Sequence, residues 1–189
     1  MDTKKRLYIS QKIISQAKNG NDKAFEIIVS TCERAIYNFI FRMVQRKEDA
    51  EDLTQETFLK IYKNIKKYNP EYKFTTWIFT IAQRTVYDFL RKKRKTKELY
   101  IIDDKDNPFE TPDKSSAYNN RDYIIDISRS LQKLDYNYKS VLWLHYWEGL
   151  SYKEIGATMR LPINTVKTYL HRAKEKLKTQ LGKEYYEKH

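Results

Sequence analysis

The chain has 189 residues and carries 37 Lys and Arg against 25 Asp and Glu, a formal net charge of +12. This charge favours a polyanionic partner, and the length allows one large domain or two small ones. Four Gly, four Pro and no alternating β-branched runs indicate a mostly helical chain. No apolar run is long enough for a membrane span and the N-terminus lacks a signal-peptide core, so we expect a cytoplasmic protein without membrane contact of its own.

Nothing in the sequence predicts catalysis. The three histidines, His145, His171 and His189, lie in unrelated contexts, and no nucleophile–base, phosphate-loop or paired-carboxylate signature occurs. Because Cys32 is the single cysteine, an internal disulfide is excluded and a thiolate metal cluster is implausible. We therefore expect no enzymatic activity, no cofactor and no metal.

Residues 8–95 hold three or four helical patterns and form the first predicted domain. Gly20 can close one helix in a left-handed conformation, and Asp22 can cap the next. A third helix is predicted in EDAEDLTQETFLKIYKNI. The residues expected on its inward face are Leu53, Phe58, Leu59, Tyr62 and Ile65.

Acidic and amide residues crowd the first turns of this third helix: Asp49, Glu51, Asp52, Gln55 and Glu56. The helix macrodipole accounts for part of this enrichment, because it favours acid at a helix N-terminus. On a chain of net charge +12 the cluster is also a candidate docking face for a basic partner.

The next predicted helix, TTWIFTIAQRTVYDFLRKKRK, follows Asn69-Pro70 and ends in the basic run Arg91–Lys95. Its aromatic residues could stack on unpaired bases, while Gln83, Arg84 and the basic run hold the backbone. These aromatic residues are Trp77, Phe79, Tyr87 and Phe89. Helical spacing also suits aromatics of a core, and we favour this position for Trp77 and Phe89.

Residues 96–121 break the helical pattern and are predicted to form a flexible linker. Pro108 and Pro112 forbid a helix across the middle, and Asn, Asp and Ser favour turns. Acidic residues outnumber basic ones here, although the protein as a whole is positive. A solvated tether and a functional acidic segment both remain open as explanations.

Residues 122–182 form the second predicted domain, which contains a helix-turn-helix between Ser151 and Leu177. Ser151 and Glu154 have the spacing of a capping box, so a helix starts at Ser151. Pro162 disfavours helical conformation at Leu161, so this helix ends by Met159 or Arg160 and a second can begin at Pro162. The second helix has an apolar stripe of Ile163, Val166, Leu170, Ala173, Leu177 and Leu181.

The opposite face of this second helix is rich in hydrogen-bond donors suited to base edges and phosphates in a major groove. It comprises Asn164, Thr165, Lys167, Thr168, His171, Arg172 and Lys174. A solvated helical hairpin would show a similar pattern. The basic charge of the chain favours DNA binding instead.

Four ordered segments together resemble an extracytoplasmic-function-type sigma factor of bacterial RNA polymerase. They are EDAEDLTQETFLKIY, KFTTWIFTIA, LDYNYKSVLWLHYWEGLSYKEIG and TVKTYLHRAKEKL. The resemblance covers nearly the whole chain. It implies an all-α fold of two small helical domains, sigma regions 2 and 4, with promoter DNA and core polymerase as partners and an anti-sigma factor as a further candidate.

Carried onto this sequence, the resemblance assigns each segment a role. Asp52, Gln55 and Glu56 dock on the β′ clamp helices, and Lys167, Thr168, His171 and Arg172 contact the −35 element. The β flap of core polymerase is a further expected contact of the protein. The loop Tyr68–Thr75 captures a flipped base of the −10 element, and the linker passes toward the active centre. The residues assigned to −10 recognition and melting are Tyr68, Asn69, Tyr72, Lys73, Phe74, Gln83, Arg84, Arg91, Lys92 and Arg94.

The chain departs from the family pattern in the helix-turn-helix and in the −10 helix. Arg160 stands where family members usually carry Gly in the turn, and it would be strained in a left-handed conformation. Gly156 stands where Ala is usual, which weakens the first helix slightly. Arg84 replaces a common Asn, and His171 replaces a more typical Arg or aromatic, so neither promoter element can be inferred by analogy.

Two other function classes compete with the sigma factor. A repressor or activator would combine a helical N-terminal effector or dimerisation domain with the helix-turn-helix. Its function would not require an acidic helix followed by a helix rich in aromatic and basic residues, as this chain has. A small nucleic-acid-processing enzyme would need a metal or nucleophile constellation, which the sequence lacks.

Overall fold

A computed structural model describes residues 7–99, 130–131 and 133–187, with side chains described except at 96–99 and 181–187. The described residues are all-α, as predicted, with seven α-helices and one short 3-10 helix. None of the described helices is both long and apolar enough to cross a membrane. Most of the predicted linker, residues 100–121, and the start of the second predicted domain lie outside the described residues.

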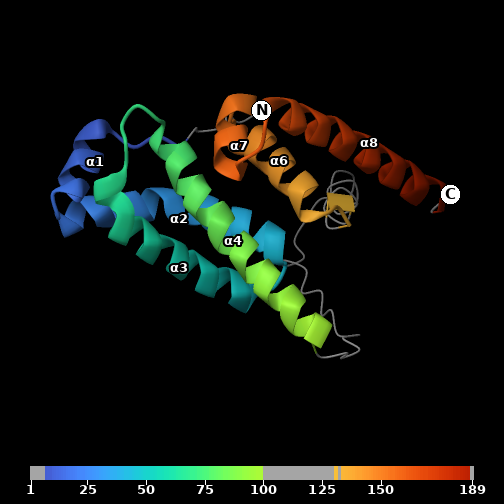
Figure 1. Ribbon diagram of the computed structural model, residues 1–189, viewed down its shortest axis with the longest axis horizontal. Helices are drawn as coiled ribbons and strands as arrows, with labels where there is room; N and C mark the ends of the chain where they lie inside the picture. The colour runs from blue at the N-terminus through green and yellow to red at the C-terminus, as the bar shows by residue number, and fades with distance from the viewer. Residues whose placement is uncertain (1–6, 100–129, 132, 188–189) are drawn as a thin grey trace, which may run out of the picture.

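The N-terminal bundle consists of α1 (Gln11–Lys18), α2 (Asp22–Val44), α3 (Lys47–Asn64), the 3-10 helix η1 (Ile65–Lys67) and α4 (Phe74–Leu99). Helix α2 packs against α1, α3 and α4 (Figure 1). Ile28, Ile36 and Ile40 of α2 are fully buried, and Phe39 meets Phe79 of α4 edge to face at 5.7 Å. Each such side chain stabilises the bundle by roughly 1.5–3 kcal/mol through burial.

The connection between α1 and α2 differs from the prediction by one residue. Gly20 is left-handed at φ 86°, as expected after a helix end. The cap of α2 is Asn21 rather than Asp22, because Asn21 has extended backbone and its Oδ1 accepts a hydrogen bond from Ala24 N at 3.0 Å. Asp22 is the first helical residue, where the helix dipole favours its charge.

The predicted inward face of α3 was partly wrong. Leu53, Phe58 and Ile65 are buried, but Leu59 is 59% exposed and Tyr62 is also exposed. Leu53, Thr57 and Ile61 succeed one another at four-residue steps on the buried face, and Leu59 lies on the opposite side of the helix. Ile61, which the prediction omitted, is fully buried.

The C-terminal bundle consists of α6 (Tyr136–Tyr146), α7 (Tyr152–Met159) and α8 (Ile163–Glu187). Val166, Leu170 and Ala173 of α8 are buried, which confirms the predicted stripe at these positions. Ile163 was placed wrongly: it begins the helix, lies near Gly156 of α7 and remains 44% exposed. Leu177 is half-buried, and Leu181 lies outside the described side chains.

The two bundles pack against each other. Helix α4 contacts α7, and α2 contacts α6, while α8 extends away from the N-terminal bundle (Figure 1). The helix predicted to read the −10 element therefore lies against the first helix of the helix-turn-helix.

Candidate nucleic-acid interface

The helix-turn-helix begins with the predicted capping box. Ser151 Oγ accepts a hydrogen bond from Glu154 N at 3.3 Å, and Ser151 N donates to Glu154 Oε2 at 2.8 Å. Both partners of the box are thus present, and α7 starts immediately after Ser151. The box fixes the start of the helix that carries the turn and orients α8 behind it.

The turn after α7 depends on Gly156 and Arg160. Arg160 is left-handed at φ 55° and ψ 45°. This is the conformation in which the sequence analysis expected a residue other than Gly to be strained. Leu161 N donates to Gly156 O at 2.9 Å, which folds the chain back over α7. A Cβ on residue 156 would lie only 2.8 Å from Leu161 O. Glycine at 156 is therefore required by the close approach of the turn, and its lower helix propensity is secondary.

The outer face of α8 is presented as predicted. The exposed residues are Asn164, Lys167, Thr168, His171, Arg172 and Lys174, and Thr165 is half-buried. Thr168 Oγ1 donates to Asn164 O at 2.9 Å, so its hydroxyl hydrogen is turned to the backbone. Lys174 Nζ lies 5.4 Å from the ring of Tyr146 on α6, and hydrogen bonding to Tyr146 raises the pKa of Lys174. This face is donor-rich and cationic, as a major-groove surface needs to be.

The loop before α4 is built around Tyr68. This residue is 2% exposed, and its ring packs against Phe74 at 5.1 Å and Trp77 at 5.5 Å. Phe74 is buried as well. Neither Tyr68 nor Phe74 can stack on a base in this arrangement, although both were assigned to DNA. Asn69, Tyr72 and Lys73 are exposed on the outside of the loop.

The aromatic residues of α4 divide between the core and the surface. Phe79 is fully buried and belongs to the core, Trp77 and Phe89 are half-buried against it, and Tyr87 is exposed. Stacking on bases is therefore excluded for Phe79, while Tyr87 remains accessible.

The polar residues assigned to DNA on α4 also differ in exposure. Gln83 is only 8% exposed, whereas Arg84 is exposed. Partial burial and the charge of Arg160 lower the pKa of Arg84, so two arginines of different bundles lie near each other. Arg91, Lys92 and Arg94 are exposed in the basic run toward the end of α4, and Arg91 pairs with Asp88 at 3.1 Å.

Contacts between the bundles cover part of the surface that the sequence assigned to −10 recognition. Lys73 Nζ lies 2.9 Å from Glu154 Oε1, and the Thr76 hydroxyl is 3.4 Å from the same oxygen. Tyr136 on α6 donates its hydroxyl to the backbone carbonyl of Gln83 at 3.1 Å. Tyr136 thus lies against Gln83, whose side chain is not accessible to a nucleic acid strand in this arrangement.

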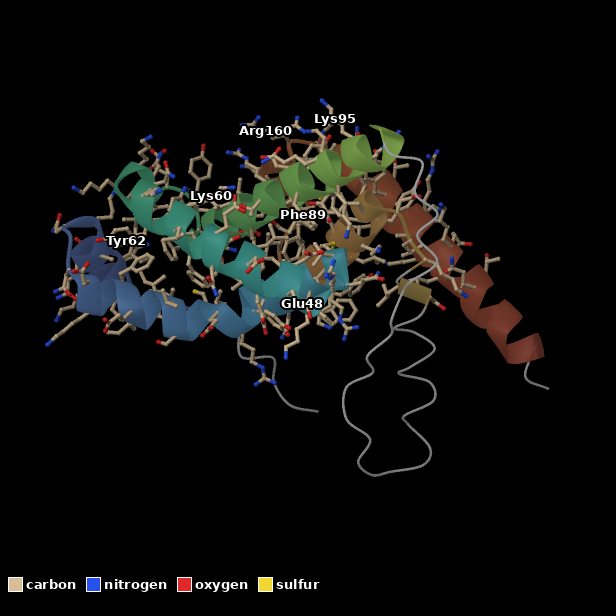
Figure 2. All side chains as sticks on the ribbon, turned by 90° about the horizontal axis from the view of Figure 1, so that it is seen from below. Glu48, Lys60, Tyr62, Phe89, Lys95 and Arg160 are labelled. Atoms are coloured by element: carbon tan, nitrogen blue, oxygen red, sulfur yellow. The ribbon has the colours of Figure 1, made fainter. Side chains whose placement is uncertain are left out.

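A separate acidic face lies on the outside of α3. Asp52, Gln55 and Glu56 are all exposed, and Leu59 follows them at the spacing of one helical turn. Glu56 pairs with Lys60 at 2.7 Å. Figure 2 shows Glu48 near one end of α3 and Lys60 and Tyr62 farther along it. Leu59 was missed as a surface residue, although its spacing from Gln55 and Glu56 placed it on their side.

Comparison with known proteins identifies both bundles. A model described as Sigma-70 region 2 matches residues 28–96, and one described as Sigma-70, region 4 matches residues 124–177. The ECF RNA polymerase sigma factor SigW of Bacillus subtilis (strain 168) is 32% identical over 185 residues, covering 90% of this chain and 96% of SigW. RNA polymerase sigma factor SigV of the same organism is 34% identical over 149 residues, covering 78% and 85%.

Two solved structures share the fold. The sigma factor RpoE from Bartonella quintana, in complex with the anti-sigma factor NepR, has a TM-score of 0.71 at 22% identity, covering 85% of this chain and 98% of RpoE. CnrH in complex with the cytosolic domain of CnrY has a TM-score of 0.67 at 23% identity, covering 90% and 96%.

Proposed function

Because this chain belongs to the extracytoplasmic-function (ECF) sigma factors and directs promoter-specific transcription initiation by RNA polymerase, we propose that its exposed surfaces divide this work between the two bundles. The repressor hypothesis has no support from the relatives. The factor acts as a regulatory subunit in the cytoplasm, and any catalysis is that of the polymerase.

Docking on core polymerase falls to the outer face of α3. Asp52 and Glu56 supply negative charge and Gln55 a neutral amide on a chain of net charge +12, which suits a basic partner helix such as the β′ clamp. Leu59 adds an exposed apolar contact within this face. A large apolar side chain surrounded by polar groups is a common anchor of protein interfaces.

Capture and melting of the −10 element fall to the loop and to α4. Asn69, Tyr72, Lys73 and Arg84 are exposed and contact the unpaired strand, while Arg91, Lys92 and Arg94 hold phosphates farther along. Tyr68 and Phe74 support the loop from inside. Gln83 contributes only after the bundles separate, since α6 now contacts the backbone beside it.

Reading of the −35 element falls to α8. The exposed side chains of Asn164, Lys167, His171 and Arg172 face outward from the buried stripe, and Thr165, Thr168 and Lys174 border them. The C-terminal bundle also meets the β flap. An anti-sigma factor is a further partner, supported by the similar sigma factor that was solved with one.

The observation that carries this proposal is the combination, on one basic chain, of an exposed acidic helix face with a helix-turn-helix. The test adds purified protein to core polymerase, measures association and maps new transcription start sites. Charge reversal at Asp52 and Glu56 to Lys should abolish association while helical content stays unchanged. The matched control reverses Glu26 and Glu33, two exposed acids of α2. Association of the α3 variant at wild-type yield would show that the docking face is misassigned.

A further inference from the structure

The −10 loop has an internal architecture of its own. Tyr68 donates its hydroxyl to Tyr72 O at 2.6 Å, across the loop. Asn69 Oδ1 accepts from Glu71 N at 3.0 Å, and Tyr72 N donates to Asn69 O at 3.2 Å. These bonds shape residues 68–72 into a turn that leaves Tyr72 62% exposed. The conformation of the turn therefore depends on where Tyr68 is held.

Two lysines connect this loop to distant parts of the chain. Lys73 reaches Glu154 of the C-terminal bundle, and this contact has to break when the bundles separate. Lys18, the last residue of α1, donates from Nζ to Tyr68 O at 2.9 Å. Its ammonium also lies 5.9 Å from the centre of the Tyr68 ring. The contact with Lys18 lies wholly within the N-terminal bundle, so it does not depend on the C-terminal bundle.

Helix α1 lies outside residues 28–96, the part of the chain that matches Sigma-70 region 2. It nevertheless packs on α2 and contacts η1, which leads directly into the loop. Burial raises the pKa of Tyr68, and the amide of Gln11 at the start of α1 lies near enough to the Tyr68 hydroxyl to offset part of this shift. Helix α1, which lies outside the matched region, thus has residues of both its first and its last turn near Tyr68, the buried residue of the loop.

We propose that Lys18 is a positioning residue for −10 strand capture, which fixes the Tyr68 carbonyl and ring so that Tyr72 and Lys73 are held ready for an unpaired strand. This inference rests on the proposed function of the loop. A hydrogen bond from an ammonium is among the stronger ones in proteins, and the ring contact adds to it. A loop held in its binding conformation loses less conformational entropy when the strand binds.

The test replaces Lys18 with Met, which keeps the aliphatic stem and removes the ammonium. Lys18→Arg is the rescue variant, because a guanidinium can also donate to the carbonyl and lie over the ring. Lys12→Met, at an exposed position of α1, is the matched control. Each variant is assembled with core polymerase on a promoter whose start site has been mapped. Affinity for a single-stranded −10 oligonucleotide, permanganate reactivity of −10 thymines and core affinity are measured.

We expect Lys18→Met to lose about tenfold in oligonucleotide affinity, with core affinity unchanged, Arg restoring most of the loss and the Lys12 control binding like wild type. Equal losses in core and oligonucleotide affinity would indicate general destabilisation and overturn the proposal, as would wild-type oligonucleotide binding. A Tyr72→Ser, Lys73→Ser variant separates the two hypotheses. If that variant also binds like wild type, the function of the loop itself fails. If it alone loses binding, only the role of Lys18 fails.

Discussion

Lys73 and Glu154 form an ion pair of 2.9 Å that joins the −10 loop of one bundle to the first turn of the helix-turn-helix in the other. Glu154 also closes the capping box with Ser151, so one carboxylate both starts α7 and holds it against the N-terminal bundle. The Lys73 side chain is largely exposed, whereas that of Glu154 is mostly covered. The pair thus makes the packing of the bundles depend on the charge of Glu154.

Acid should weaken this contact. Burial alone would raise the pKa of Glu154, but hydrogen bonds from Ser151 and Lys73 outweigh it and lower the pKa to about 2. A carboxyl with a lowered pKa stabilises the fold above its unfolded pKa, near 4.5, and loses that contribution as pH falls toward 2. We expect a loss on the order of 1–2 kcal/mol in this window, after screening by solvent.

Urea unfolding between pH 6 and pH 2.5 measures this loss. Glu154→Gln retains a capping side chain but removes the charge, so its unfolding free energy should vary less over the window than that of wild type. Glu175→Gln, at an exposed position of α8, is the control. A Glu154→Gln profile parallel to that of wild type would contradict the assignment.

Gly156→Ala should destabilise the protein. Helix propensity alone favours Ala by about 1 kcal/mol. The added Cβ, however, would lie 2.8 Å from Leu161 O, a backbone atom that cannot rotate away. We expect the clash to dominate, with a net loss of about 1–3 kcal/mol measured by urea unfolding. Ala157→Gly, at an exposed position of the same helix, should also destabilise, but only by its lower propensity. Stabilisation by Gly156→Ala would show that the turn can shift.

Arg160→Gly should stabilise the isolated protein. Arg160 is left-handed, which costs roughly 1 kcal/mol for a residue with a Cβ and nothing comparable for Gly. The substitution also removes a like charge near Arg84. Arg160→Ala separates the two effects, because it removes the charge and keeps the backbone strain. If Ala stabilises as much as Gly in a thermal unfolding experiment, charge rather than backbone conformation is responsible.

Arg172→Ala should weaken −35 binding by about 1–3 kcal/mol and relax base preference there, if Arg172 reads a base edge. Substitution of Lys92 and Arg94 with Ala should instead weaken binding on all sequences and lower the salt slope, as expected for the phosphate contacts proposed for these residues. Filter binding of the holoenzyme to matched and scrambled −35 sequences measures both effects. Arg34→Ala, on the surface of α2, controls for the loss of one positive charge. Equal losses of affinity on both sequences would show that Arg172 contacts a phosphate and does not read a base.

Cys32 should resist thiol reagents until the N-terminal bundle opens. It is fully buried, and burial raises its pKa to about 12, so almost none is thiolate at pH 8. Release of coloured thiolate from a disulfide reagent should therefore be slow in the native protein and complete in urea. The rate at which Cys32 reacts in the native protein then measures how often the bundle around α2 opens. Reaction at the rate of a free cysteine without denaturant would show that α2 is accessible.

The sequence predicted best those features that local chemistry determines. Ser151 with Glu154 indicated the capping box and Gly20 the left-handed turn, because both depend on neighbouring residues. The exposure of Asp52 and Arg172 followed from helical spacing and charge. Leu59 and Tyr62 were placed wrongly because a helix with apolar residues on several sides does not reveal which side meets its neighbour.

Features that arise between distant segments could not be predicted. Tyr68 was assigned to DNA because the loop matched the family, but its burial depends on Phe74, Trp77 and Lys18 together. The need for glycine at position 156 is local, but it depends on the exact fold of the turn that brings the carbonyl of Leu161 back over α7, which the sequence pattern does not reveal. The cover over Gln83 comes from Tyr136, more than fifty residues later.

The cover over Gln83 makes promoter affinity a property of an equilibrium within the chain. If Gln83 contacts the −10 strand as proposed, it does so only in the fraction of molecules in which α6 has left α4, and observed affinity falls in proportion to that fraction. At an open fraction of about 1%, DNA binding by the free protein is about a hundredfold weaker than that of the separated form. Any partner that holds the bundles apart then raises DNA affinity without touching a base. The contacts of α6 and α7 with α4 would thus keep the DNA affinity of the free protein low.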